Sequence, residues 1–83
     1  MNDLYYTFRS VTAATAARHA LQGGAVFCSL MRTPAKLRKQ GCGYSLRIRA
    51  ADRQRAEALL ARAALAYQKA YYLDGGAWRE AAP

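Results

Sequence analysis

An apolar stripe between residues 56 and 67 constrains the fold more than any other feature of this sequence. Its members recur at helical spacing: Ala56, Leu59, Leu60, Ala63, Ala64 and Tyr67. A helix with a single apolar side must bury that side against another layer of structure. Since the chain has 83 residues, it can build only one thin core, and we expect one domain over residues 1–83.

A second helix and several short strands surround this stripe. Ser10 is a suitable N-cap for an alanine-rich helix over residues 11–21, and Gly23-Gly24 should end that helix. Alternation and β-branched or aromatic residues predict strands at residues 4–8, 25–31, 44–49 and 70–73. A turn at residues 74–76 allows residues 77–79 to return as a hairpin arm.

The resulting order of elements is β-α-β-β-α-β. This order predicts an α+β protein with a ferredoxin-like, two-layer sandwich, in which two helices cover one face of an antiparallel sheet. The expected core consists of Phe8, Val26, Leu46, Ile48, Leu59 and Leu60. Because this fold serves many unrelated functions, the function has to be argued from individual residues.

The charge of the chain favours anionic partners. It has 13 Lys and Arg against 5 Asp and Glu, which gives a net charge of +8. We do not expect nucleic acid as the partner, because the strand at residues 44–49 has a single aromatic residue. The sequence shows no signal peptide and no apolar stretch long enough for a membrane span, which predicts a cytoplasmic protein.

Cys42 is the most informative residue for chemistry. It lies between Gly41 and Gly43, ahead of a strand and close to Lys36, Lys39 and Arg47. Nearby positive charge lowers the pKa of a thiol, and flanking glycines leave the sulfur accessible. This pattern favours a carrier thiol that holds a persulfide, a selenide adduct or a mixed disulfide. The alternative is a turn that needs glycines for its backbone, with a cysteine filling a small hole.

The other candidate sites are weaker. Cys28 is expected to be buried in the second strand, with a resolving thiol as the alternative, which requires the two Cα atoms to lie within about 7 Å. His19 is the only histidine and no Cys-x-x-Cys motif is present, so we expect no metal site and no cofactor. No catalytic arrangement of residues is visible, which argues against a free-standing enzyme.

Three segments resemble a known family. Residues 5–10, 32–37 and 41–47 are similar to the small bacterial selenium/sulfur (Se/S) carrier-like proteins, and the resemblance extends over essentially the whole chain. The Cys-Gly pair of that family falls on Cys42 and Gly43. The resemblance implies a sulfur or selenium carrier. Cys28 is not required by the family pattern, so the number of thiols involved stays open.

Together, these observations predict a protein that accepts sulfur or selenium on Cys42. The expected donor is a sulfurtransferase, a cysteine desulfurase or another protein of selenium metabolism. Gly41 and Gly43 would keep the thiol accessible, while Lys36, Lys39 and Arg47 would stabilise its anion. A regulatory or protein-docking module is the alternative, and RNA binding is a third. Exposed edge strands also make a homodimer an option.

Overall fold

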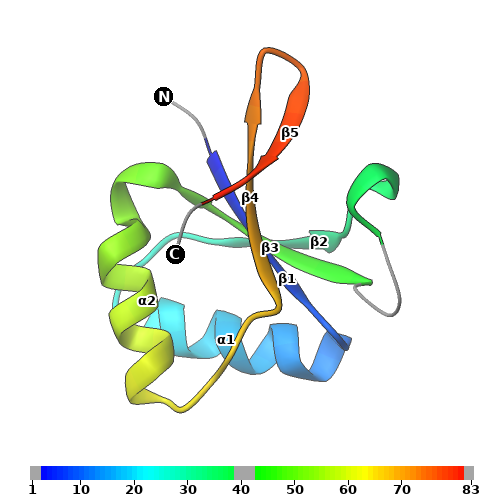
Figure 1. Ribbon diagram of the computed structural model, residues 1–83. Helices are drawn as coiled ribbons and strands as arrows, with labels where there is room; N and C mark the ends of the chain where they lie inside the picture. The colour runs from blue at the N-terminus through cyan, green and yellow to red at the C-terminus, as the bar shows by residue number, and fades with distance from the viewer. Residues whose placement is uncertain (1–2, 39–42, 82–83) are drawn as a thin grey trace.

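The computed structural model describes residues 3–38 and 43–81 (Figure 1). The elements are, in chain order, β1 (Asp3–Phe8), α1 (Val11–Gly23), β2 (Ser29–Arg32), the 3-10 turn η1 (Ala35–Leu37), β3 (Tyr44–Arg49), the 3-10 turn η2 (Ala50–Asp52), α2 (Arg53–Arg62), β4 (Lys69–Asp74) and β5 (Ala77–Glu80). Within the described residues the fold is therefore α+β, as predicted, with two α-helices and one antiparallel sheet.

The sheet has five strands in the order β2-β3-β1-β4-β5. Every neighbouring pair is antiparallel. The predicted sandwich had four strands in its sheet, and β5 adds a fifth at the β4 edge. Gly75 and Gly76 have φ of 58° and 85°, which is the backbone conformation that a tight two-residue hairpin needs. The hairpin arm expected after this turn is thus a full strand.

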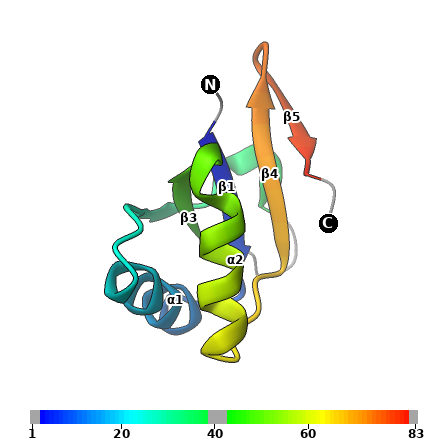
Figure 2. The same cartoon turned by 90° about the vertical axis from the view of Figure 1, so that its left-hand side faces the viewer.

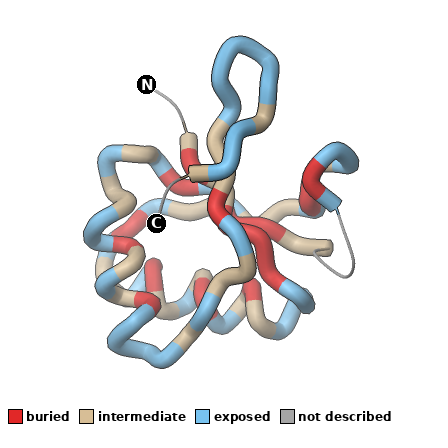
Figure 3. The backbone as a smooth tube through the Cα atoms, viewed as in Figure 1, coloured by how far each residue is buried: buried red, intermediate tan, exposed pale blue. Residues whose placement is uncertain are grey.

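The core lies between the sheet and the two helices. One face of β1 and β3 supplies large side chains, and the helices contribute mainly alanines, which let them lie close to the sheet. Figure 3 shows the buried residues in red at intervals along the strands and helices, and Figure 2 shows the two helices beside the strands. Of the predicted core, Phe8, Val26, Leu46, Ile48 and Leu60 are buried, while Leu59 is half-buried and packs against the cluster.

The helix ends follow local backbone chemistry. Ser10 caps α1 as predicted, because its side-chain oxygen accepts a hydrogen bond of 3.1 Å from the backbone N–H of Ala13. The apolar stripe suggests that the second helix continues to Tyr67, but α2 ends at Arg62. Ala64 has φ of 56°, and the N–H of Leu65 turns back to the carbonyl of Leu60 at 2.9 Å.

Candidate functional site

The turn η1 is fastened to the beginning of β3. The backbone N–H of Thr33 donates to the carbonyl of Gly43 at 3.0 Å, and the hydroxyls of Thr33 and Ser45 lie 2.7 Å apart in a buried hydrogen bond. Leu37 of η1 is buried, and the Arg38 guanidinium folds back to donate to the Thr33 carbonyl at 3.4 Å. These contacts fix both ends of the segment that contains the predicted carrier thiol.

The predicted site residues fall into three groups. Lys39, Gly41 and Cys42 lie outside the described residues. Lys36 is exposed on η1, and Gly43 lies at the same end of the sheet, because Thr33 just before η1 pairs with Gly43. Arg47 lies further along β3, four residues or about 13 Å from Gly43. Its Nε is 3.8 Å from the Asp3 carboxylate. The structure thus places η1, which carries Lys36, at the Gly43 end of β3, and it pairs Arg47 with Asp3.

Cys28 precedes β2, although the sequence predicts it inside a strand. The backbone N–H groups of Gly24, Ala25 and Val26 donate to the carbonyls of Leu21 and Gln22 at 2.9–3.1 Å. Ala25 also has φ of 62°, so this segment closes the helix instead of extending a strand. The predicted strand over residues 25–31 therefore begins only at Ser29.

The thiol of Cys28 is half-buried, which corrects the prediction that it is buried. Burial raises the pKa of Cys28, and the nearby positive charge of Arg18 lowers it by less. The net effect disfavours the thiolate. Cys28 is therefore a weaker nucleophile at neutral pH than an ordinary exposed cysteine.

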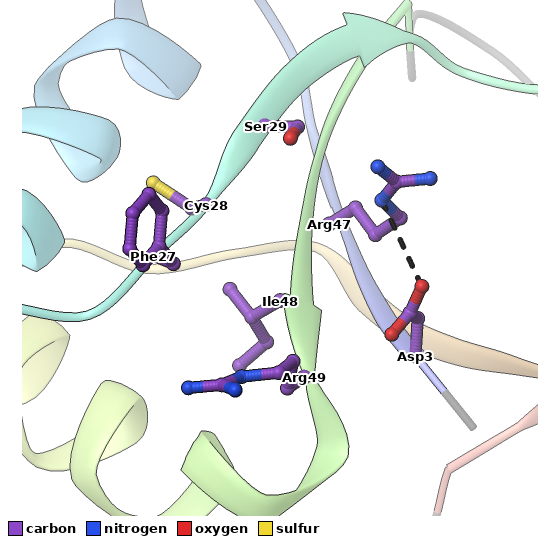
Figure 4. A pocket seen from close by; sticks show the side chains of 7 residues that line it. All are labelled: Asp3, Phe27, Cys28, Ser29, Arg47, Ile48 and Arg49. Carbon is purple, nitrogen blue, oxygen red and sulfur yellow. Dashed lines mark ion pairs between the residues drawn. The ribbon is translucent and has the colours of Figure 1, made fainter. Parts of the chain in front are cut away.

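A hollow of about 180 Å³ lies beside Cys28 (Figure 4). It is lined by Asp3, Phe27, Cys28, Ser29, Arg47, Ile48 and Arg49. The Arg47 guanidinium is engaged with Asp3, and Arg49 Nε is 3.6 Å from Asp52. Phe27 is 83% exposed at its edge. Sequence reasoning did not single out Phe27, because alternation only placed it on the strand face opposite to Cys28.

A second cluster surrounds the carboxylate of Glu57 on α2. Tyr6 and Tyr67 donate their hydroxyls to it at 3.1 and 3.4 Å, and Arg53 donates from Nε at 2.9 Å. Burial raises the pKa of both tyrosines, and the charge of Glu57 raises it further. The cluster ties α2 to β1 and to the segment before β4. The sequence signal for it is the Arg53–Glu57 pair, four residues apart on one helix.

One family model matches the chain, over residues 3–72, and its description reads "Putative Se/S carrier protein-like". The chain belongs to this family. The family resemblance found in the sequence is thereby confirmed. No curated protein and no solved structure matches the chain.

The family match begins with β1, ends within β4 and includes the positions of both cysteines. Among the residues that the structure describes, no three His, Cys, Asp or Glu side chains come together in a way that could hold a metal ion. His19 is exposed on α1. No described helix is long and apolar enough to cross a membrane.

Proposed function

We propose that the protein carries sulfur or selenium as a persulfide or perselenide on Cys42. The observation that carries this proposal is the family match, which spans the Cys42-Gly43 pair. The protein would act as a carrier in the cytoplasm rather than as a free-standing enzyme. Its donor would be a sulfurtransferase, a cysteine desulfurase or another protein of selenium metabolism. We propose the ferredoxin-like sandwich, extended by β5, as the fold class.

The chemical step needs no cofactor and no outside oxidant. The Cys42 thiolate attacks the outer sulfur of a donor persulfide, R–S–SH, and forms a new S–S bond. The S–S bond of the donor breaks, and its electron pair stays with the inner sulfur, which leaves as the donor thiolate. Cys42 then carries –S–SH, and the number of electrons is balanced. A donor perselenide, R–S–SeH, transfers selenium by the same route.

The surroundings of Cys28 support Cys42 as the carrier. Burial raises the pKa of Cys28, so its thiolate fraction is low at neutral pH. Gly43, the neighbour of Cys42 in the sequence, is hydrogen-bonded to Thr33, which lies five residues after Cys28. Five residues of extended chain span about 16 Å, and a disulfide needs Cα atoms within about 7 Å. These features favour a mechanism with one thiol.

Positive charge near the beginning of β3 supports an anionic cargo. Lys36 and Arg38 are exposed on and just after η1, which Thr33 and Leu37 hold against the sheet. A persulfide is a stronger acid than a thiol and is an anion at neutral pH, so cations stabilise it. We include Lys39 in this group and expect a smaller contribution from Arg47, because Asp3 already neutralises its charge.

Intact mass spectrometry after incubation with a cysteine desulfurase and cysteine tests the proposal. The wild type and the Cys28→Ser control should both gain the mass of one sulfur atom, which a reducing agent then removes. Cys42→Ser should not gain it while retaining the fold. Loading of Cys42→Ser at the wild-type level would contradict the proposal. If neither thiol is loaded by desulfurase or polysulfide, the docking-module alternative gains support.

A further inference from the structure

The face of the sheet that the helices leave open carries an aromatic cluster. Tyr5 lies opposite Arg47 on one side and Tyr71 on the other, and Trp78 lies opposite Leu73. Leu4 and Tyr6, the neighbours of Tyr5, belong to the core on the helix side. Because side chains alternate along a strand, Tyr5 points to the other face. The residues opposite it, Arg47 and Tyr71, point the same way, as do Leu73 and Trp78. The rings of Tyr5 and Trp78 meet edge to face with centroids 4.9 Å apart.

Two exposed apolar side chains lie on either side of this cluster: Leu73 on β4, and Phe27 just before β2 at the other edge of the sheet. Among the described residues, the large hydrophobic side chains that are exposed are Val11, Phe27 and Leu73. Leu73 points to the open face beside Trp78. Phe27 stands at the edge of the hollow that Asp3, Arg47 and Arg49 line from β1 and β3 (Figure 4). A protruding aromatic side chain and a hollow therefore lie next to each other.

The charges of this face compensate one another. Arg47 pairs with Asp3, Lys69 with Glu80 and Arg49 with Asp52, at 3.8, 3.4 and 3.6 Å. These six side chains have three positive and three negative charges, whereas the whole chain has a net charge of +8. Uncompensated positive charge lies outside this cluster of pairs. It is found on the exposed Arg55 and Arg62 of α2 and, beyond Ser45 at the η1 end of the sheet, on the exposed Lys36 and Arg38.

We propose that the open face of the sheet is the interface of a homodimer. Two copies of a chain with a charge of +8 repel each other, and the repulsion is weakest where the faces in contact are neutral. Nucleic acid or an acidic protein would instead be attracted to the exposed cations of α2 and of the η1 segment. The inference rests on this surface alone and is independent of the thiol chemistry.

The shape of the face suits a two-fold axis. In such an interface the same patch is used by both copies, so the Phe27 side chain of one copy can enter the hollow of the other. A standard interface removes about 800 Å² of surface from each partner. The chain has 5275 Å² of accessible surface, so the interface needs roughly a seventh of it, which one face of a two-layer molecule can supply.

Sedimentation velocity over a range of protein concentrations, at physiological ionic strength, tests the proposal. The wild type should pass from monomer to dimer as its concentration rises. Leu73→Glu and Phe27→Glu each replace an apolar contact of the interface by a carboxylate that loses its water on association. Each should raise the dimer dissociation constant roughly tenfold or more. Val11→Glu is the matched control, because Val11 is exposed on α1, and it should leave the constant unchanged. Fluorescence of Trp78, the single tryptophan, reports burial of the face independently.

Three results would overturn the proposal. The first is a wild-type monomer at every concentration. The second is a dimer that neither Leu73→Glu nor Phe27→Glu weakens. The third is a monomer that binds a single-stranded oligonucleotide and loses this binding in Leu73→Glu, which would make the face a nucleic-acid surface. Circular dichroism of both variants confirms that they are folded before the comparison is made.

Discussion

At the scale of single residues, the half-buried position of Cys28 controls its proton affinity. Burial raises the pKa of this thiol, and the charge of Arg18 opposes the effect. The variant Cys42→Ser keeps Cys28 as its one cysteine, so its reaction with iodoacetamide reports on Cys28 alone. The pH at which this reaction reaches half its maximal rate should be higher than for an exposed thiol. Arg18→Gln should move this midpoint higher, and unfolding in urea should restore the ordinary value. A native midpoint at or below the urea value would contradict this prediction.

The same shift makes stability depend on pH. The native state holds the Cys28 proton more tightly than the unfolded state, because its pKa is raised. Its contribution to stability is complete below the unfolded pKa and is lost as the pH rises through the folded pKa. The stabilising effect therefore declines on the alkaline side only.

Glu57 is the other residue with a clear individual role. Its carboxylate accepts from Tyr6, Arg53 and Tyr67, which come from three different segments. Glu57→Gln replaces one acceptor oxygen by a donor and removes the charge, so urea unfolding should show a loss of about 1–3 kcal/mol. Glu80→Gln is the matched control, since the Glu80 pair with Lys69 is exposed, and its cost should be about 0–0.5 kcal/mol. Equal losses in the two variants would refute a special role for Glu57.

At the scale of elements, Gly24 determines how closely the end of α1 approaches α2. A Cβ at this position would press against Cδ1 of Leu59 and lie 2.7 Å from its Cδ2. Gly24→Ala should cost about 1–3 kcal/mol in chemical unfolding, because the leucine has to move. Gly23→Ala is the control, since a Cβ there meets nothing within 4 Å. In a Leu59→Ala background the cost of Gly24→Ala should fall towards zero, and a cost that persists there would show that the clash is not the cause.

The elements also show which parts of the fold the sequence predicts. The third strand and the N-cap at Ser10 were predictable, because alternation and capping are local signals. The true beginning of β2 was not, since Phe27 and Cys28 alternate like strand residues while the preceding amides bond to the end of α1. The end of α2 was also missed, because alanines at positions 63 and 64 continue the helical pattern and only the left-handed backbone at Ala64 breaks it.

For the candidate site, the sequence supplies only what is local. Cys42, Gly43 and Lys36 are close in sequence and lie within the range of the family match, and their role as a carrier site stays a prediction. The pairing of Arg47 with Asp3 depends on the register between β1 and β3, which the sequence alone did not fix. The Glu57 cluster likewise needs Tyr6 and Tyr67 to be brought together by the fold.

At the scale of the whole molecule, charge is distributed unevenly between the ion pairs and the remaining basic residues. All five acidic residues have an ion-pair partner: Asp3, Asp52, Glu57, Asp74 and Glu80. Most of these pairs are exposed, so each contributes about 0–1 kcal/mol. The net charge of +8 remains, and its self-repulsion opposes the compact state. Salt therefore weakens the small attraction within the exposed ion pairs and the larger repulsion among the excess positive charges.

We predict that added salt stabilises this protein. Raising sodium chloride from about 0.01 M to 0.15 M shortens the screening length from about 30 Å to about 8 Å. The longest dimension of the molecule is 31 Å, so repulsion across the whole chain is screened while contacts of 3–4 Å are affected less. The melting temperature, measured at low protein concentration, should rise by several degrees, since about 1 kcal/mol corresponds to roughly 4–8 °C in a domain of this size. Arg55→Gln lowers the net charge to +7 and should raise the melting temperature at low salt while reducing its salt dependence. A melting temperature that falls with salt would mean that the ion pairs, and not the excess positive charge, dominate the electrostatic free energy of the fold.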